Sequence, residues 1–244
     1  MQRFFINKDS ISAGQVKITD PRVHQIRDVL RMKTGNEIIV LDNTGMEYHA
    51  RLTGISQKEI TGEIIDQNKC EAEPHTSITL YQSMLARDKF EVVLQKCTEV
   101  GVTCFVPVIT ERSIVRKPEK ITKEKLSRFE SIIAEAAEQS GRGIIPSIKS
   151  PVTMNQALAE LDGYDICLFG STLDCVSLKE ILRSNASIPG KIALFIGPEG
   201  GFSDGELEEF SHRGVKAFSL GRRILRTETA GIVASSLILY ELEQ

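Results

Sequence analysis

Hydrophobic positions in the first 70 residues come in short runs that are separated by turn-forming residues. Apolar runs cover residues 37–41, 48–52 and 60–65, and the turn sequence Asp42-Asn43-Thr44-Gly45 separates the first two. Short strands at this spacing are typical of a small barrel or sandwich. The pattern therefore predicts a β-rich first domain.

One segment of this first domain has a different period. After Asp20-Pro21, apolar residues recur at intervals of three and four, which predicts a helix, and proline is tolerated in a first helical turn. The apolar positions are Val23, Ile26, Val29 and Leu30. The other face is basic and carries Arg22, His24, Arg27, Arg31 and Lys33 against Asp20 and Asp28. Such a local basic face is a candidate surface for nucleic acid.

Beyond residue 76, strand-like runs alternate with helical segments. The preceding segment, 68–76, is polar, contains Pro74 and has no periodicity, which indicates a linker. The strand-like segments are 77–85, 104–109, 164–170, 191–197 and 216–221, and the helical ones are 88–101, 123–140, 153–161, 177–184, 204–213 and 229–242. This alternation predicts an α/β domain with a mostly parallel sheet. We expect domains at residues 1–70 and 77–244, joined by a linker at 71–76.

Composition narrows the class of protein. Hydrophobic residues make up 41% of the chain and charged residues 26%, which excludes disorder, collagen and coiled coil as the main state. No run approaches the ~20 apolar residues of a membrane span, and the N-terminus lacks the long apolar core of a signal peptide. We therefore expect a soluble cytoplasmic protein. Since the net charge is −3, any nucleic-acid surface must be a local patch.

The cysteines and histidines do not indicate a metal or a disulfide framework. The five cysteines are an odd number and form no C-x-x-C pair, which argues against a zinc site and against structural disulfides. The four histidines are scattered without metal-ligand spacing, and no Ser-His-Asp or Cys-His arrangement is apparent. Hydrolase and metalloenzyme functions are therefore disfavoured, and we expect no metal.

Three of the predicted strands end in glycine, at Gly170, Gly197 and Gly221. In an open α/β sheet, ligands bind outside the carboxyl ends of the strands, and glycine there allows the backbone to approach a ligand closely. Glycines also simply end strands, which is the plainer interpretation of any one of them. All three together favour one crevice that is lined by three loops.

The loop with the sequence Gly197-Pro-Glu-Gly-Gly-Phe-Ser203 is the most specific of the three. It matches neither the G-x-G-x-x-G pattern nor the Walker A pattern, which argues against dinucleotide and nucleoside triphosphate sites. Ser203 and Glu206 have the spacing of a capping box, so a helix begins directly after the loop. The bare backbone at Gly200 and Gly201 could offer N–H and C=O groups to the edge of a flat base. A plain tight turn is the alternative.

The loop at residues 221–231 is basic. Five basic residues and no acidic one lie between Arg213 and Arg226, and Glu228 follows. We expect the apolar pair Ile224-Leu225 to anchor this loop against the core, and Thr227 or Thr229 to cap the final helix. Such anchoring would hold the flanking charged residues in fixed positions, as a catalytic or binding loop requires. A solvated basic turn is the alternative.

A second charged region runs from residue 111 to residue 142. Its first part is rich in basic residues, among them Arg112 and Arg116, and is more often simply a solvated face. In the helix that follows, spacings of seven, three and four place one group of charged residues on one face, Arg128, Glu135, Glu138 and Arg142. Ion pairs between helical turns would explain this face. The functional alternative is a charged stripe beside a substrate.

Four groups of residues, spread over nearly the whole chain, carry a family resemblance. The first contains Arg3-Phe4-Phe5, His24 and Val29-Leu30-Arg31; the second Gln95-Lys96, Thr98-Glu99, Gly101-Val102 and Glu111-Arg112-Ser113; the third Glu135-Ala-Ala-Glu-Gln-Ser140 with Arg142; the last Ile196-Gly-Pro-Glu-Gly-Gly201, Leu220-Gly221, Arg223-Ile-Leu-Arg226 and Glu228-Thr-Ala230. Together they resemble the RsmE family, the bacterial 16S ribosomal RNA uridine N3-methyltransferases of the SPOUT class. Departures such as Cys97 and Phe129 lie outside the terminal motifs.

The resemblance implies a fold and an assembly. The first domain would be a PUA-like RNA-binding β-barrel. The second would be a SPOUT domain, in which a parallel sheet is flanked by helices and the chain forms a trefoil knot near its C-terminus. Knots are otherwise essentially absent from proteins, so the pattern of elements alone predicts an unknotted sheet. Family members act as homodimers with the active site at the subunit interface.

The resemblance also implies a cofactor, S-adenosylmethionine, and a metal-free reaction. The residues that match the cofactor pocket are Gly170, Gly197, Gly201, Leu220, Ile224, Leu225 and Ala230. The residues expected to contact 16S ribosomal RNA, whether naked or within the small ribosomal subunit, are Arg22, Arg27, Arg31, Arg112 and Arg116.

Uridine N3 carries a proton in the neutral base, so methylation needs a general base or stabilisation of the uracil anion. Arg226 and Arg142 are candidates for stabilising the negative charge on O2 and O4. Glu138 or Glu228 are candidates for taking the proton, although Glu228 could instead orient Arg226. Since N3 lies on the Watson–Crick edge, the base must be unpaired or flipped out. The alternatives are a SPOUT methyltransferase with another RNA target and a non-catalytic dimeric RNA-binding protein.

Overall fold

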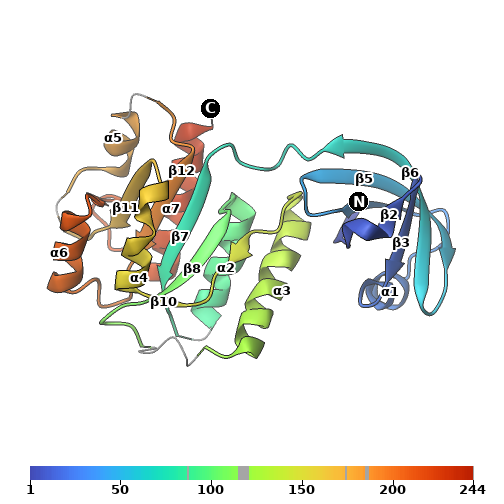
Figure 1. Cartoon of the computed structure of the whole chain (residues 1–244), viewed down its shortest axis with the longest axis horizontal. Coiled ribbons are helices and arrows are strands. Elements are labelled where there is room, and N and C mark those ends of the chain that lie inside the picture. Colours follow the sequence, from blue (N-terminus) through green and yellow to red (C-terminus); the bar gives the residue numbers. More distant parts are fainter. Residues whose placement is uncertain (87, 115–120, 174, 185–186, 244) are drawn as a thin grey trace. The chain divides into compact units, whose positions relative to one another are not determined.

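In the computed structural model (Figure 1), the described residues are 1–86, 88–114, 121–173, 175–184 and 187–243. Contacts divide the chain into two compact units. Unit 1 contains Met1–Glu73 together with Ala137–Ile145, and unit 2 contains Pro74–Ala136 and Pro146–Gln244. Residues 137–145, which the sequence analysis assigns to the second domain, thus have their contacts with the first unit.

Unit 1 is built on a six-stranded sheet within its described residues, in the order β1-β4-β5-β6-β3-β2. Only the β1–β4 pair is parallel in this sheet. Alternate residues along the strands are buried, so one face of the sheet encloses a core that includes Phe4, Val16 and Ile38. The strands are β1 (Gln2–Phe5), β2 (Ile11–Ser12), β3 (Gln15–Thr19), β4 (Glu37–Leu41), β5 (Met46–Ile55) and β6 (Glu59–Lys69), and a short 3-10 helix covers Lys8–Ser10.

The helix predicted after Asp20-Pro21 is present but short. It consists of α1 (Arg22–His24) followed by one π-helical segment, Gln25–Val29. Val23 and Ile26 are buried as expected, but Val29 is 64% exposed. The expectation that Val29 belongs to the buried stripe is wrong, because the wider π turn rotates the last residues away from the α-helical spacing.

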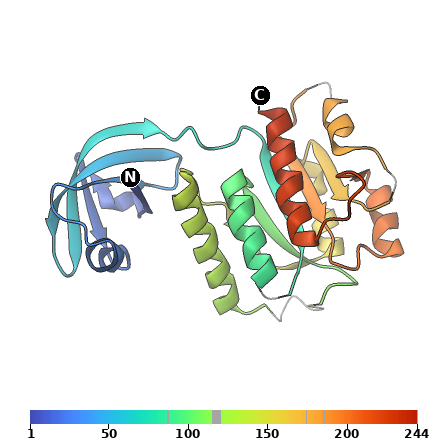
Figure 2. The same ribbon diagram turned by 180° about the vertical axis from the view of Figure 1, so that it is seen from behind.

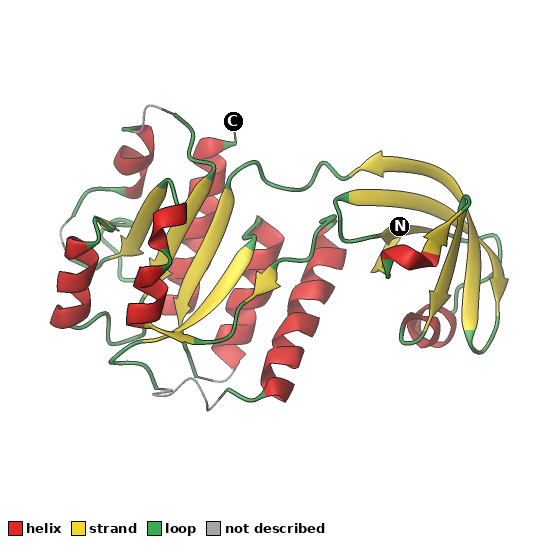
Figure 3. Cartoon of the chain, viewed as in Figure 1, coloured by secondary structure: helices red, strands yellow, loops and turns green. Residues whose placement is uncertain are grey.

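Unit 2 contains a sheet whose described strands all pair in parallel, in the order β10-β8-β7-β12-β11-β13, with β9 paired to β8 (Figure 3). The predicted mostly parallel sheet is therefore confirmed. Its strands are β7 (Ser77–Ser83), β8 (Cys104–Ile109), β9 (Ser147–Ile148), β10 (Val152–Thr153), β11 (Ile166–Gly170), β12 (Lys191–Ile196) and β13 (Lys216–Phe218).

Helices cover both faces of this sheet. Figure 2 shows α3 (Lys123–Ser140), α2 (Asp88–Val100) and α7 (Thr227–Leu242) side by side on one face. On the other face lie α4 (Met154–Ala159), which leads into a 3-10 turn at Leu161–Gly163, and α6 (Asp204–His212). A further helix, α5 (Leu178–Arg183), contacts α7. The helix at the end of the chain begins two residues before the predicted 229.

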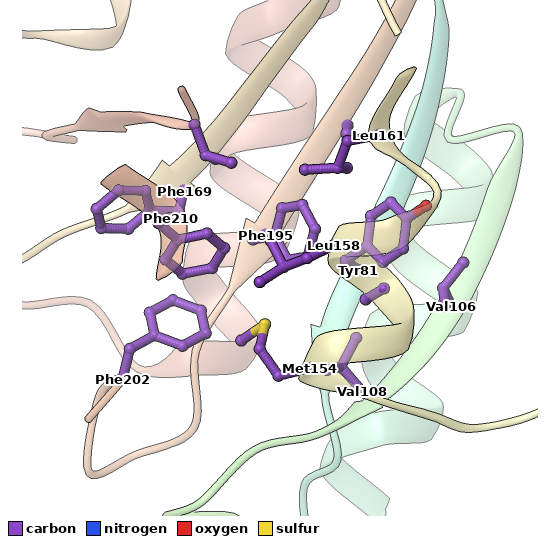
Figure 4. Close-up of a cluster of buried hydrophobic side chains, with 13 residues drawn as sticks. Tyr81, Val106, Val108, Met154, Leu158, Leu161, Phe169, Phe195, Phe202 and Phe210 are labelled. Atoms are coloured by element: carbon purple, nitrogen blue, oxygen red, sulfur yellow. The ribbon is translucent and has the colours of Figure 1, made fainter. Parts of the chain in front are cut away.

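Aromatic residues fill the core between the sheet and the helices α4 and α6 (Figure 4). Tyr81 and Phe195 come from neighbouring strands and stack with their ring centroids 4.4 Å apart. Phe169 stacks on Phe210 at 4.5 Å, and Phe202 meets Phe210 edge-on at 4.9 Å. Since Phe202 ends the glycine-rich loop that follows β12, this core fixes one end of that loop.

Candidate active site

The three predicted glycine-ended loops meet at one edge of the unit 2 sheet. Strand β11 lies between β12 and β13, and all three are parallel, so their carboxyl ends are neighbours. The amide of Ser171, just after Gly170, donates a hydrogen bond of 2.9 Å to the carbonyl of Phe218 at the end of β13. The edge at which the sequence predicts a crevice is therefore bordered by the loops after β11, β12 and β13.

The loop after β12 needs glycine at two positions. Gly201 has a φ of +69°, which side-chain-bearing residues rarely adopt, and its amide donates to the carbonyl of Pro198 at 2.9 Å to close a tight turn. At Gly197, a Cβ would lie 3.1 Å from the ring of Phe202. A side chain would therefore strain the backbone at position 201 and displace the Phe202 ring at position 197.

Arg112 and Glu206 make hydrogen bonds to the same loop. The Arg112 guanidinium donates from Nη1 to the carbonyl oxygens of Gly200, at 3.0 Å, and of Phe202, at 3.1 Å. Glu206 completes the predicted capping box with Ser203 and also accepts from the Glu111 amide at 2.8 Å. Arg112, expected to contact RNA, thus has hydrogen bonds to this loop.

The start of α7 is joined to the loop after β12. The Thr227 hydroxyl donates to the carbonyl oxygen of Gly197 and accepts from Gln82 Nε2 at 3.4 Å. The prediction that Thr227 or Thr229 caps α7 is wrong. The cap position is Arg226, whose side chain makes no capping hydrogen bond. The hydroxyl of Thr227 is instead used to connect two loops.

Ile224 does not anchor the loop at residues 221–231. Its side chain is 83% exposed, so the anchoring role expected for it is wrong, while Leu225 is half-buried. The turn is shaped by backbone instead: Gly221 has a φ of +101° and donates to the Ser219 hydroxyl at 3.1 Å. Leu220 and Ala230 are half-buried, so together with Ile224 they present apolar surface that the chain itself does not fully cover.

Charged residues of both signs lie where these loops meet. Lys89 Nζ, in the first turn of α2, is 2.9 Å from Glu199 Oε1 and 3.8 Å from Glu228 Oε2. The hydrogen bond raises the pKa of Lys89 and lowers the pKa of Glu199. Arg226 is exposed and lies close enough to oppose the rise in the pKa of Lys89. Sequence reasoning missed Lys89, because nothing distinguishes it from other surface lysines of a helix.

The other two predicted catalytic residues, Glu138 and Arg142, belong to unit 1 and are buried there. Glu138 accepts from the amide of Phe5 at 2.8 Å and forms an ion pair with Arg22. Arg142 Nη2 is 2.7 Å from Glu73 Oε2. The four predicted catalytic residues are therefore divided between the units, with Arg226 and Glu228 in unit 2.

The residues expected to contact RNA differ in their surroundings. Arg22 is engaged with Glu138, and Arg27 makes hydrogen bonds of 2.7 and 2.6 Å to Asp28, which lower the pKa of Asp28 to about 2. Arg31 is exposed and has no ion pair with another described residue. Arg116 lies outside the described residues.

Among the described residues, no group of three or more histidine, cysteine, aspartate or glutamate side chains is arranged to hold a metal ion. No helix within the same ranges has both the length and the apolar character that crossing a membrane requires.

Comparison with known proteins places this geometry in a family. Residues 72–239 match an RNA methyltransferase domain, and residues 18–65 match an RNA methyltransferase PUA domain. The chain is 32% identical to ribosomal RNA small subunit methyltransferase E of Bacillus subtilis, over all of this chain and 98% of that protein. It is 31% identical to the protein of that name in Synechocystis, over 99% of this chain and 78% of the relative.

Solved structures agree with this assignment. A ribosomal RNA small subunit methyltransferase E from Neisseria gonorrhoeae, bound to S-adenosylmethionine, is 33% identical with a TM-score of 0.87, over 98% of this chain and 96% of that one. A methyltransferase from Legionella pneumophila in complex with the same cofactor is 30% identical with a TM-score of 0.87, over 97% and 96% of the two chains. The expected PUA-like barrel and α/β SPOUT methyltransferase domain are thereby confirmed, and the chain belongs to the RsmE family of ribosomal RNA methyltransferases.

Proposed function

We propose that this protein transfers a methyl group from S-adenosylmethionine to N3 of a uridine in 16S ribosomal RNA. The observation that carries the proposal is the meeting of three loops at the carboxyl edge of the unit 2 sheet, with Arg226 at the end of the last loop and Glu228 in the first turn of α7 that follows it. Relatives that match this chain over 98% and 78% of their own length are named ribosomal RNA small subunit methyltransferase E, and a solved protein of that name has S-adenosylmethionine bound.

The residues of the crevice fit the proposed cofactor. A Cβ at Gly201 or Gly221 would meet nothing within 4 Å, so the space beside these two Cα atoms is open and a ligand can lie there. Apolar side chains at Leu220, Ile224 and Leu225 remain partly or largely accessible and can cover the face of an adenine. The proposed pocket comprises Gly170, Gly197, Gly201, Leu220, Ile224, Leu225 and Ala230. The cofactor supplies an electrophilic methyl group when bound.

The protein's own residues would prepare the nucleophile. Glu228 has a carboxylate beside the crevice and can take the N3 proton of a flipped-out uridine. Arg226 can donate hydrogen bonds to O2 or O4 as negative charge develops there. We favour this pair over Glu138 and Arg142, because those two residues already have partners within unit 1. Glu138 binds the Phe5 amide and Arg22, and Arg142 forms an ion pair with Glu73. Arg142 stays the next candidate for charge stabilisation.

We further propose the assembly that the family resemblance implies. The active protein would be a homodimer with a trefoil knot near the C-terminus, it would act in the cytoplasm, and unit 1 would bind ribosomal RNA through Arg22, Arg27 and Arg31, with Arg112 and Arg116 adding contacts from the second domain. The domain boundaries at residues 70 and 77 belong to this proposal. Sedimentation at several protein concentrations tests the dimer.

The central experiment incubates the purified protein with S-adenosylmethionine labelled in its methyl group. Naked 16S ribosomal RNA, small ribosomal subunits and transfer RNA are offered separately, and the nucleosides are then identified by mass spectrometry. We expect 3-methyluridine in 16S ribosomal RNA. Label in transfer RNA alone, or in another nucleoside, would indicate a methyltransferase with a different target. RNA binding without any transfer would indicate a non-catalytic RNA-binding protein.

A further inference from the structure

Lys89 contacts two acidic residues, one in a loop beside the predicted crevice and one at the start of a helix. Its ammonium group forms a hydrogen bond of 2.9 Å with Glu199, in the loop after β12, and lies 3.8 Å from Glu228, in the first turn of α7. Lys89 itself belongs to α2, which packs beside α7. One side chain from a third element thus bridges the loops that are proposed to enclose the cofactor and carry the chemistry.

The environment of Glu228 makes this bridge more than a surface ion pair. The Glu228 side chain is only 15% exposed, and its Oε2 atom is buried without a hydrogen-bond partner among the described residues. A buried carboxylate oxygen is costly unless a counter-charge is close. The Lys89 Nζ atom lies 3.8 Å from Glu228 Oε2 and supplies this counter-charge.

Charges of both signs surround the Glu228 carboxylate. Lys89 and Arg226 supply two positive charges beside the two negative charges of Glu199 and Glu228. A second connection lies next to this group, where the Thr227 hydroxyl binds the Gly197 carbonyl. The start of α7 and the loop after β12 are therefore joined twice, once by the Thr227 hydroxyl and once by Lys89.

We propose that Lys89 is a positioning residue for methyl transfer: it holds the Glu228 carboxylate in place beside the predicted crevice while Glu199 fixes the position of the lysine. The inference rests on the proposed function and names Lys89 as a further residue of that site. The ammonium group acts only through Glu228. The alternative is an exposed ion pair between Lys89 and Glu199, 39% and 42% exposed, of the kind that contributes little.

The test compares three single variants. Lys89→Met removes the charge and keeps the length, Lys89→Arg restores a charge, and Lys96→Met is the matched control. Lys96 lies on the same helix, is 45% exposed and forms an ion pair of 2.8 Å with Glu99. The readouts are the single-turnover rate of methyl transfer, the affinity for S-adenosylhomocysteine and the melting temperature.

We expect Lys89→Met to lower the single-turnover rate about tenfold or more, because a misplaced base loses part of the ~10²–10⁴-fold effect of general base catalysis. Affinity for S-adenosylhomocysteine and the melting temperature should change little. Lys89→Arg should recover most of the rate, and Lys96→Met should resemble the wild type. A wild-type rate in Lys89→Met would overturn the proposal while leaving the proposed function intact.

A double variant separates positioning from stability. If Lys89 acts through Glu228, then Lys89→Met should have no further effect on the rate of Glu228→Gln, because the lysine has nothing left to position. Independent effects that multiply, together with a lower melting temperature in Lys89→Met, would show a structural role and overturn the proposal. No transfer by the wild type to any RNA would refute the proposed function itself, and this inference with it.

Discussion

Arg226 is the residue on which the proposed chemistry depends most directly. It occupies the cap position of α7, is exposed, and has no side-chain capping bond that would explain its presence there. A guanidinium group offers a planar fork of donors to a carbonyl oxygen on which negative charge develops. A catalytic role predicts that replacing Arg226 lowers the rate of methyl transfer, whereas a structural role predicts that it lowers the melting temperature as well.

We expect Arg226→Ala to reduce the rate of methyl transfer by about 10²–10³, the scale for losing one preorganised donor. Arg226→Lys should recover only part of it, since lysine keeps the charge and loses the fork. Affinities for cofactor and RNA should change little, because the interaction belongs to the transition state. Single-turnover kinetics, cofactor titration and melting temperature check this. Near-normal turnover by a well-folded Arg226→Ala protein would leave Arg142 as the next candidate.

Gly143 illustrates a glycine that is required by packing. A Cβ at this position would lie 2.6 Å from Cys70 Cβ and 3.1 Å from the Cα atom of Gly45, and neither neighbour is the flexible end of a long side chain. We expect Gly143→Ala to lower the free energy of unfolding by about 1–3 kcal/mol, as overpacking does. Chemical denaturation measures this. Gly163→Ala is the control, because a Cβ there meets nothing within 4 Å, and equal effects of the two substitutions would contradict the prediction.

Among the elements, the loop after β12 depends on a side chain that is remote in sequence. Arg112 donates to two of its carbonyl oxygens, and the capping box at Ser203 and Glu206 fixes the point where α6 begins. The loop is thus held at both ends and at its middle. Its rigidity is part of the proposed cofactor pocket, because backbone groups can read a ligand edge only if they stay in place.

Arg112→Met should therefore weaken the binding of S-adenosylhomocysteine by about tenfold, since hydrogen bonds to a charged donor contribute ~1.5–3 kcal/mol. Isothermal titration measures the affinity. The salt dependence of RNA binding, measured on the same variant, tests the other interpretation of this arginine. Unchanged cofactor affinity combined with a shallower salt dependence would mean that Arg112 serves the RNA surface and not the loop.

The long elements could be predicted from the sequence, and the short ones could not. The periodic segments of α2 and α3 and the apolar runs of β8 and β12 agree with the structure to within one residue. The two-residue strands β9 and β10 carry too few positions to show a period. The burial predicted for Val29 is wrong because a π turn decides which side chains face the core there. The burial predicted for Ile224 is wrong because a backbone turn at Gly221 shapes its loop.

For the whole molecule, the net charge of −3 means that RNA binding depends on local basic surface. The arginines of the basic face after Pro21 differ in their surroundings. Arg27 is neutralised by Asp28, whereas Arg31 is exposed without an ion pair among the described residues. The meeting of the three glycine-ended loops at one edge of the sheet could be predicted from the strand pattern and the glycines. The ion pairs could not, because Glu138, Arg142 and Lys89 find their partners 69 to 139 positions away in the chain.

We expect Arg31→Glu to weaken binding to 16S ribosomal RNA and to reduce its salt dependence, because an unpaired arginine releases about one counterion when it meets a phosphate. Arg27→Glu should have a smaller effect on the slope, since Asp28 already offsets the charge of Arg27. Affinities over a series of salt concentrations provide the comparison. Unchanged slopes for both variants would mean that this face is merely solvated.

The discontinuity of unit 1 bears on the order in which the protein is made. Its strands are complete once residue 69 has been synthesised. Two buried partners are synthesised about 70 residues later: Glu138, which accepts a hydrogen bond from the Phe5 amide, and Arg142, which forms an ion pair with Glu73. At ~5–20 residues per second, a nascent chain waits several seconds with these buried partners missing. We therefore expect the first unit to form its last buried contacts only after α2, β8 and α3 have been translated, so that its completion waits for the second domain.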